Sequence, residues 1–145
     1  MQDHETAERN MHTLRDSGVR LALDDFGTGY SSLSFLRQLP VSIVKVDQSF
    51  VAGLGQRRED DLIVAGVISM AHALGHSVTA EGIETTAQLD SLRGLGCRYG
   101  QGFLWSRAVP RSELALTIAT IERNRDEYQR SEMVLPDSET RDDGD

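Results

Sequence analysis

Several residue types are scarce in this chain, and each scarcity removes a class of protein. Cys97 is the only cysteine among the 145 residues, so neither an internal disulfide nor a thiolate metal site is possible. No apolar run approaches the roughly 18 to 20 residues that a membrane-spanning helix needs. The first residues do not resemble a signal peptide. We therefore expect a cytoplasmic protein without a membrane segment, in which Cys97 is a small buried hydrophobic residue.

Lysine is almost absent. Lys45 is the only lysine among fifteen basic residues, the others being arginine. No basic stripe is present, so binding to duplex nucleic acid is not expected. Lys45 lies within the strand-like run of residues 41–47, where a compact, mobile ammonium would fit better than a planar guanidinium. Chance is the alternative explanation until the position of Lys45 in the fold is considered.

Acidic residues gather at the C-terminal end of the chain. The formal net charge is −8, and residues 122–145 hold nine acidic residues against four arginines. This last segment lacks apolar periodicity, whereas the rest of the chain has the length of one ordinary domain. We predict a folded domain over residues 1–128 and a disordered acidic tail over residues 129–145.

Short apolar runs alternate with helical patterns along the folded part. Strands are predicted at residues 20–23, 42–46, 77–80 and 98–102. Helices are predicted at residues 6–16, 31–38, 60–74, 85–95 and 112 to about 128. The connections are too long for hairpins, which favours right-handed βα units and a parallel sheet. The fold class is therefore α/β.

Each predicted strand ends in a polar side chain. In chain order these side chains are Asp24 (followed by Asp25), Lys45, Glu81 and Gln101. The carboxyl ends of parallel strands meet at one edge of a sheet, and residues i and i+2 share a face. This arrangement is typical of the active site of a (β/α) barrel, although the ligand-binding edge of an open doubly wound sheet would look similar.

The adjacent carboxylates of Asp24 and Asp25 require a compensating charge. Two like charges about 4 Å apart repel by roughly 4 kcal/mol at an effective dielectric constant near 20. Such a pair persists if one acid is protonated or if a cation lies between them. The chain turns at Gly27 and Gly29, which places the acids on a rim. An isolated Asp-Asp pair has a competing interpretation, in which one Asp caps the next helix and the other is solvated.

Two other enzyme classes share parts of this pattern. Asp25-Phe26-Gly27 resembles the metal motif of protein kinases, but no nucleotide loop or catalytic loop accompanies it. Lys45 at a strand end could form a Schiff base, as in an aldolase, but the Asp pair would then have no role. Neither class accounts for all the polar strand ends.

Several further residues have a structural and a functional interpretation. His72 and His76 are four residues apart, but Gly75 separates them, which favours solvated surface histidines. Glu84 either binds metal or supports the loop and the helix cap at Thr85, and the second is favoured. Phe103 and Trp105 could stack on a guanine base, although core or rim positions are favoured.

Four ordered motifs resemble those of one family. Residues 24–33 (DDFGTGYSSL) resemble the signature of EAL-domain proteins, the bacterial phosphodiesterases of cyclic di-GMP. Residues 43–47 (IVKVD) resemble the lysine strand of that family, residues 79–85 (TAEGIET) its second acidic motif, and residues 100–103 (GQGF) its glutamine motif. The resemblance covers roughly residues 5–120.

The resemblance implies a TIM-like barrel with a two-metal site for Mg²⁺ or Mn²⁺ at its C-terminal mouth. Asp24 and Asp25 would be metal ligands, and Glu81 a ligand or the activator of the attacking water. Lys45 would stabilise charge near that water and the phosphate, and Gln101 would help to hold the site. The implied activity is hydrolysis of cyclic di-GMP to linear pGpG in second-messenger signalling.

The resemblance also implies a loop with two roles. In the family, the segment that matches Gly27, Thr28, Gly29, Tyr30 and Ser31 couples dimerisation to metal and substrate binding. A homodimer could form through this loop or through open sheet edges, since unpaired edges invite strand pairing.

The N-terminal motifs of the family have no counterpart here. The Glu-Ala-Leu strand, the Asn strand and the Glu-bearing strand of the family precede the Asp-Asp strand, and residues 2–15 instead resemble the helix just after them. We therefore expect about four C-terminal βα units of the barrel, with some metal ligands missing. Two hypotheses remain: a phosphodiesterase fragment, or a truncated, inactive module that binds cyclic di-GMP or a protein partner.

Overall fold

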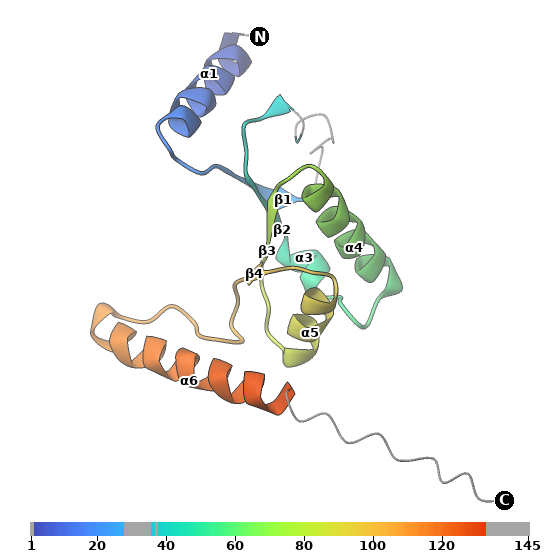
Figure 1. The fold of residues 1–145 in the computed structure, drawn as a ribbon, viewed down its shortest axis with the longest axis vertical. Helices are drawn as coiled ribbons and strands as arrows, with labels where there is room; N and C mark the ends of the chain where they lie inside the picture. Colours follow the sequence, from blue (N-terminus) through green and yellow to red (C-terminus); the bar gives the residue numbers. More distant parts are fainter. Residues whose placement is uncertain (1, 28–35, 37, 133–145) are drawn as a thin grey trace, which may run out of the picture. The chain divides into compact units, whose positions relative to one another are not determined.

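The structure is a computed structural model that describes residues 2–27, 36 and 38–132. The chain divides into two compact units, Met1–Trp105 and Ser106–Asp145. The first unit holds helix α1 (Gln2–Asp16) and a sheet with its covering helices (Figure 1). Among the described residues, no helix is both long and apolar enough to span a membrane.

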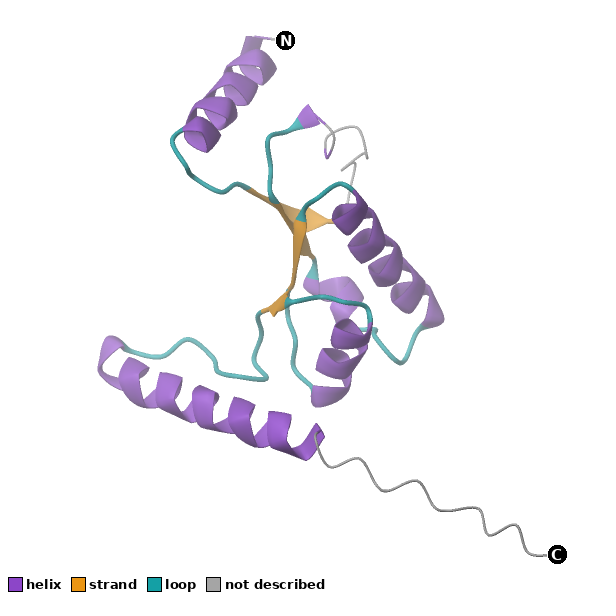
Figure 2. Cartoon of the chain, viewed as in Figure 1, coloured by secondary structure: helices purple, strands orange, loops and turns teal. Residues whose placement is uncertain are grey.

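A parallel sheet forms the centre of the first unit. Its strands are β1 (Ala22–Phe26), β2 (Ile43–Val46), β3 (Ser77–Ala80) and β4 (Tyr99–Gly100). All neighbours are parallel and the order is β1-β2-β3-β4, so each strand lies beside its neighbour in sequence. The strands are drawn in orange in Figure 2. The predicted α/β class is confirmed, and the sequential order is that of consecutive βα units in a barrel.

The helices cover one face of this sheet. Helices α3 (Gln48–Val51), α4 (Arg58–Ala73) and α5 (Thr86–Gly94) lie on the same side of the strands (Figure 1). The strand side chains on that side are buried, because alternate residues of a strand point to the same face. They are Val44, Val46, Val78 and Ala80, and they share one apolar core with Val64, Ile68 and Ala71 of α4 and Leu92 of α5.

The opposite face of the sheet is only partly covered. Ala22 of β1 is exposed, and Ile43, Lys45, Ser77 and Thr79 of the next two strands are half-buried. Ala22 pairs with Ile43, and Lys45 pairs with Thr79. Alternate residues of a strand share a face, so Lys45 lies on the open face of the sheet. Residues at the strand ends that follow the same alternation are expected on this face as well.

The strands and one helix differ from the sequence prediction. β1 begins later than residue 20 and continues through both aspartates to Phe26. β4 is confined to Tyr99 and Gly100, shorter than the predicted residues 98–102. Helix α3 was not predicted, because a four-residue helix is too short for apolar periodicity; Asp47 caps its N-terminus. The helix predicted at residues 31–38 lies largely outside the described residues.

The second unit contains one long helix. After Pro110 the chain makes a single 3₁₀ turn, η1 (Arg111–Glu113), and continues as helix α6 (Leu114–Glu132). The helix therefore ends four residues later than the predicted end near residue 128. Residues 133–145, most of the predicted acidic tail, lie outside the described residues, so the domain boundaries stay a prediction.

Candidate metal and phosphate site

The end of β1 presents both aspartates to solvent. Asp25 adopts a left-handed backbone conformation with φ of 52°. Asp tolerates this region better than most residues, because its short polar side chain can form local hydrogen bonds. The pairing of β1 with β2 is irregular between Leu23 and Phe26, and the Asp25 amide donates to Asp24 Oδ1 over 3.2 Å. This bulge exposes both carboxylates where a straight strand would alternate them between the two faces.

Lys45 lies between two carboxylates from the flanking strands. Its Nζ is 2.8 Å from Asp24 Oδ1 and 2.5 Å from Glu81 Oε1. Because β2 is the middle strand, its ammonium can reach β1 on one side and the end of β3 on the other. The three residues that the sequence placed at separate strand ends therefore form one charged network.

Gln101 completes the network at the fourth strand. The parallel hydrogen bonding continues past the strand ends, because the Glu81 amide donates to Val46 O and the Gln101 amide to Ala80 O. The Gln101 side chain then donates through Nε2 to Glu81 Oε1 over 2.7 Å. Lys45 and Gln101 thus both contact the same oxygen of Glu81, which fixes the orientation of this carboxylate.

Asp24, Asp25 and Glu81 form a cluster that is slightly wider than a bound metal ion would need. Each offers one carboxylate oxygen, and the three oxygens lie within 4.8 Å of one another. Two oxygens bound to one Mg²⁺ at about 2.1 Å can be at most about 4.2 Å apart, so a small side-chain movement would close the cluster. The donor set consists of hard oxygens, which suit Mg²⁺, Mn²⁺ or Ca²⁺ better than Zn²⁺. The residues present therefore fit a divalent cation.

The ion pairs shift the titration of their members. The hydrogen bond from Lys45 is the main cause that lowers the pKa of Asp24. The hydrogen bonds to Asp24 and then to Glu81 raise the pKa of Lys45. Asp24 and Lys45 are consequently both charged at neutral pH, and the network carries its charges without a bound ion.

Acid should weaken this network, because the pKa of Asp24 is lower in the folded protein than in the unfolded chain. The ionised Asp24 carboxylate stabilises the folded state at pH values above its unfolded-state pKa. This stabilisation is lost as the pH falls through the pKa of Asp24 in the folded protein, below about pH 4. We expect the urea midpoint to fall less between about pH 7 and about pH 3 in Asp24→Asn than in the wild type. The Asp24 side chain is 62% exposed, so the difference should be small and should shrink further in high salt. Equal acid dependence in the two proteins at low salt would contradict the pairing.

The glycine-rich loop is described only at its start. Gly27 has φ of 108°, and a Cβ there would lie 2.7 Å from Phe50 Cε2, so the position requires glycine. Thr28, Gly29, Tyr30 and Ser31 lie outside the described residues. Their proposed contribution to substrate binding and dimerisation therefore stays a prediction.

The segment after Glu81 is held by a capping box. The Thr85 side chain accepts a hydrogen bond from the Gln88 amide, and Gln88 Oε1 accepts from the amides of Glu84 (2.8 Å) and Thr85 (3.0 Å). Gln88 is buried and Glu84 is exposed. The cap predicted at Thr85 is present, and Glu84 contributes to it through its backbone. Gln88 was not among the predicted residues, although Thr-x-x-Gln is a capping-box pattern.

Asp47 is an acidic residue near the cluster that was not predicted to belong to the site. It follows β2 two residues after Lys45, and its charge acts on Asp24 by raising the pKa of that carboxyl. Asp47 Oδ1 accepts the Ser49 amide over 2.9 Å, and the hydrogen bonds from Ser49 lower its own pKa. The i, i+2 spacing from Lys45 was the available signal. Asp47 therefore caps α3 and adds negative charge near the cluster.

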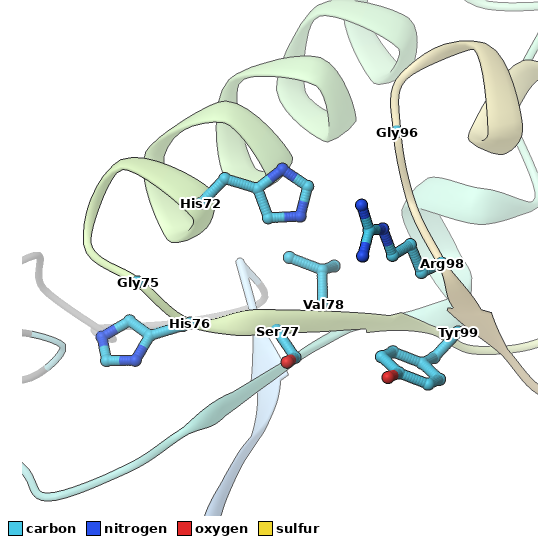
Figure 3. Close-up of a pocket in the computed structure, with 8 residues that line it drawn as sticks. All are labelled: His72, Gly75, His76, Ser77, Val78, Gly96, Arg98 and Tyr99. Atoms are coloured by element: carbon cyan, nitrogen blue, oxygen red, sulfur yellow. The ribbon is translucent and has the colours of Figure 1, made fainter.

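A separate hollow lies at the opposite end of the strands. It has a volume of about 520 Å³ and is lined by residues that include His72, His76 and Arg98 (Figure 3). His72 belongs to the last turn of α4, where a basic side chain complements the negative end of the helix dipole. His72 is exposed and His76 half-buried, close to the predicted surface positions. His72 therefore has a structural role at the end of α4.

The remaining candidates differ in burial. Trp105 is half-buried and packs against the core, which matches the favoured structural interpretation, and Phe103 is 52% exposed. Cys97 is buried, as predicted, and burial raises the pKa of its thiol. A nucleotide-stacking function for the aromatic pair stays untested.

Comparison with known proteins agrees with this geometry. The EAL domain family matches residues 1–108. Over 104 residues the chain is 46% identical to the cyclic di-GMP phosphodiesterase NbdA of Pseudomonas aeruginosa, covering 72% of this chain and 13% of NbdA. The crystal structure of the EAL domain of Mycobacterium smegmatis DcpA superimposes with a TM-score of 0.75 at 45% identity, covering 82% of this chain and 53% of that one.

A further solved structure contains both a metal and a nucleotide. Klebsiella pneumoniae BlrP1, in a manganese and cyclic di-GMP complex, matches with a TM-score of 0.64 at 40% identity, covering 68% of this chain and 25% of that one. This chain spans between 13% and 18% of the length of the curated relatives compared. The family match extends over most of the chain and includes the parallel sheet and its four polar strand ends, so the chain belongs to the EAL domain family.

Proposed function

We propose that this chain contributes to a metal-dependent phosphodiesterase that hydrolyses cyclic di-GMP to linear pGpG in bacterial second-messenger signalling. The observation that carries the proposal is the position of Lys45 between Asp24 and Glu81, beside a carboxylate cluster that could hold a metal ion. This combination supports a cation site with a positive charge beside it at one edge of the sheet. The name of the relative NbdA supports cyclic di-GMP as the substrate.

Asp24, Asp25 and Glu81 would hold the divalent cation. When bound, the cation would lower the pKa of a water molecule bound to it and compensate negative charge on the phosphate. The oxygen ligands favour Mg²⁺ or Mn²⁺ as the physiological ion. The manganese complex of BlrP1 supports a divalent cation as the cofactor. A second metal ion, as in the family, would need ligands beyond this cluster.

Lys45 and Gln101 would have different tasks. The ammonium of Lys45 supplies positive charge where negative charge develops on the phosphoryl oxygens. Gln101 holds the carboxylate of Glu81 through the 2.7 Å hydrogen bond, so that its second oxygen can face the cation or the water. The half-buried environment of Lys45, whose side chain is 23% exposed, reduces screening by water.

A homodimer is the proposed assembly, through the Gly27–Ser31 loop or through the sheet edges. In the described part of the chain, β1 and β4 each pair with a strand on one side only. Unpaired edges of this kind are available to another chain. Sedimentation equilibrium over a range of protein concentrations tests this proposal.

A second candidate function is a non-catalytic module that binds cyclic di-GMP or a protein partner. It is favoured by one observation: the cluster found among the described residues offers three carboxylates, which can form an incomplete set of ligands for a two-metal site. Such a module would retain binding while losing the water-activating step.

One experiment separates the two candidates. The purified chain is incubated with cyclic di-GMP and Mn²⁺, and pGpG is quantified by chromatography while binding is followed by calorimetry. Production of pGpG that Lys45→Ala and Asp24→Asn both abolish supports the phosphodiesterase. Binding without turnover supports the module. If the chain shows neither binding nor turnover, both functions are contradicted for this chain.

A further inference from the structure

Lys45 occupies the space in which a bound cation would be expected. Its Nζ contacts Asp24 Oδ1 and Glu81 Oε1, and both residues belong to the carboxylate cluster. The ammonium therefore already compensates the repulsion between the acids.

An ammonium and a divalent cation cannot both remain in close contact with these oxygens. Both would lie within a few ångströms of each other in a half-buried position, where their repulsion is only partly screened. Glu81 Oε1 also accepts the hydrogen bond from Gln101, which leaves little room for further contacts at that oxygen. Binding of a metal ion must therefore move either the ammonium or the carboxylates.

The ammonium is the more mobile partner. Glu81 is held by Gln101 and by the backbone hydrogen bond to Val46, and Gly82 behind it packs on the first turn of α3, where an added Cβ would lie 2.5 Å from Gln48 Cβ. Lys45 extends from the open face of the sheet on a flexible four-carbon stem. Withdrawal of Lys45 toward solvent requires no movement of the backbone.

We infer that Lys45 is the internal counter-cation of the metal-free site and that a divalent cation binds by displacing its ammonium from Asp24 and Glu81. This inference rests on the proposed function, because it assumes the same metal site. Two consequences follow. Lys45 lowers the metal affinity of the site, and metal binding releases the ammonium for an anionic group of the substrate. Occupation of the metal site and phosphate contact by Lys45 are thereby linked.

The single lysine makes this inference directly measurable. Protein labelled with ¹³C at the lysine ε-carbon gives one side-chain resonance, because Lys45 is the only lysine. Mg²⁺ titration should shift this resonance with the half-saturation that calorimetry measures for binding. Calorimetry should also show that Lys45→Met binds Mg²⁺ about tenfold more tightly than the wild type, since a nearby like charge has been removed. Arg15→Met, which removes an arginine paired with Asp16 in α1, should leave the affinity unchanged.

The outcomes distinguish the inference from the proposed function. Equal or weaker Mg²⁺ binding by Lys45→Met overturns the inference and leaves the metal site in place. A lysine resonance that stays fixed while Mg²⁺ binds overturns it in the wild type, even if the variant fails to fold. Absence of binding by both proteins overturns the metal site together with the inference. Binding by Lys45→Met alone supports the inference in its strongest form.

Discussion

Glu81→Gln should strongly weaken the metal-dependent properties of this chain while leaving its fold intact. The substitution keeps the shape of the side chain and its ability to meet Gln101, but removes one of the three carboxylates of the cluster. It also removes the more buried partner of Lys45, because the Glu81 side chain is only 15% exposed whereas that of Asp24 is 62% exposed. We expect the affinity for Mn²⁺ to fall at least about tenfold. Turnover of cyclic di-GMP should fall by about 10² to 10⁴.

A matched variant separates this effect from a general loss of negative charge. Glu8→Gln makes the same chemical change on an exposed position of α1, outside the carboxylate cluster. Its Mn²⁺ affinity should equal that of the wild type. Calorimetric titration of both variants with Mn²⁺ provides the comparison. If Glu81→Gln binds Mn²⁺ as tightly as Glu8→Gln, then Glu81 is not part of the metal site.

Gly102→Ala should cause the largest loss of stability. A Cβ at this position would lie 2.1 Å from Ile83 O and 2.2 Å from Ile83 N, so the two backbone segments would have to separate. Ile83 donates to Gln101 O over 3.1 Å and accepts from Leu104 N over 2.9 Å, and both hydrogen bonds depend on this approach. We expect the free energy of unfolding to fall by about 2–4 kcal/mol, as for other strained, overpacked positions.

Gly94→Ala is the control for this substitution. Gly94 is the last residue of α5, and a Cβ there would meet no atom within 4 Å. Alanine should therefore stabilise the protein by up to about 1 kcal/mol, through helix propensity and a less flexible unfolded chain. Urea unfolding followed by circular dichroism measures both variants. Equal stability of the two would show that the close packing between Gly102 and Ile83 is not required by the fold.

The sequence was sufficient to predict which strand ends meet. Apolar runs marked the strands, and a period of two placed Lys45 and the polar ends of the neighbouring strands on one face. The parallel topology then required these ends to lie at one edge. The fold class and the association of Asp24, Lys45, Glu81 and Gln101 follow from local patterns that packing did not override.

The sequence could not predict the detailed geometry. The left-handed conformation of Asp25 and the bulge around it depend on how β1 pairs with β2, which is a tertiary property. Helix α3 is stabilised by its Asp47 cap and by packing, because four residues are too few for an independent helix. The position of Lys45 between two acids required the actual strand register, since a shift of one residue would move it to the other face.

The most direct test of the proposed metal site is the conversion of cyclic di-GMP to pGpG by the purified chain, measured with Mn²⁺ and with a chelator, in the wild type and in Glu81→Gln. We expect conversion only by the wild type and only with Mn²⁺, because Asp24, Asp25 and Glu81 would act together as a cation site. Conversion that persists in chelator or in Glu81→Gln would contradict a metal site at this edge of the sheet. The absence of conversion by the wild type under all conditions would contradict catalysis by this chain.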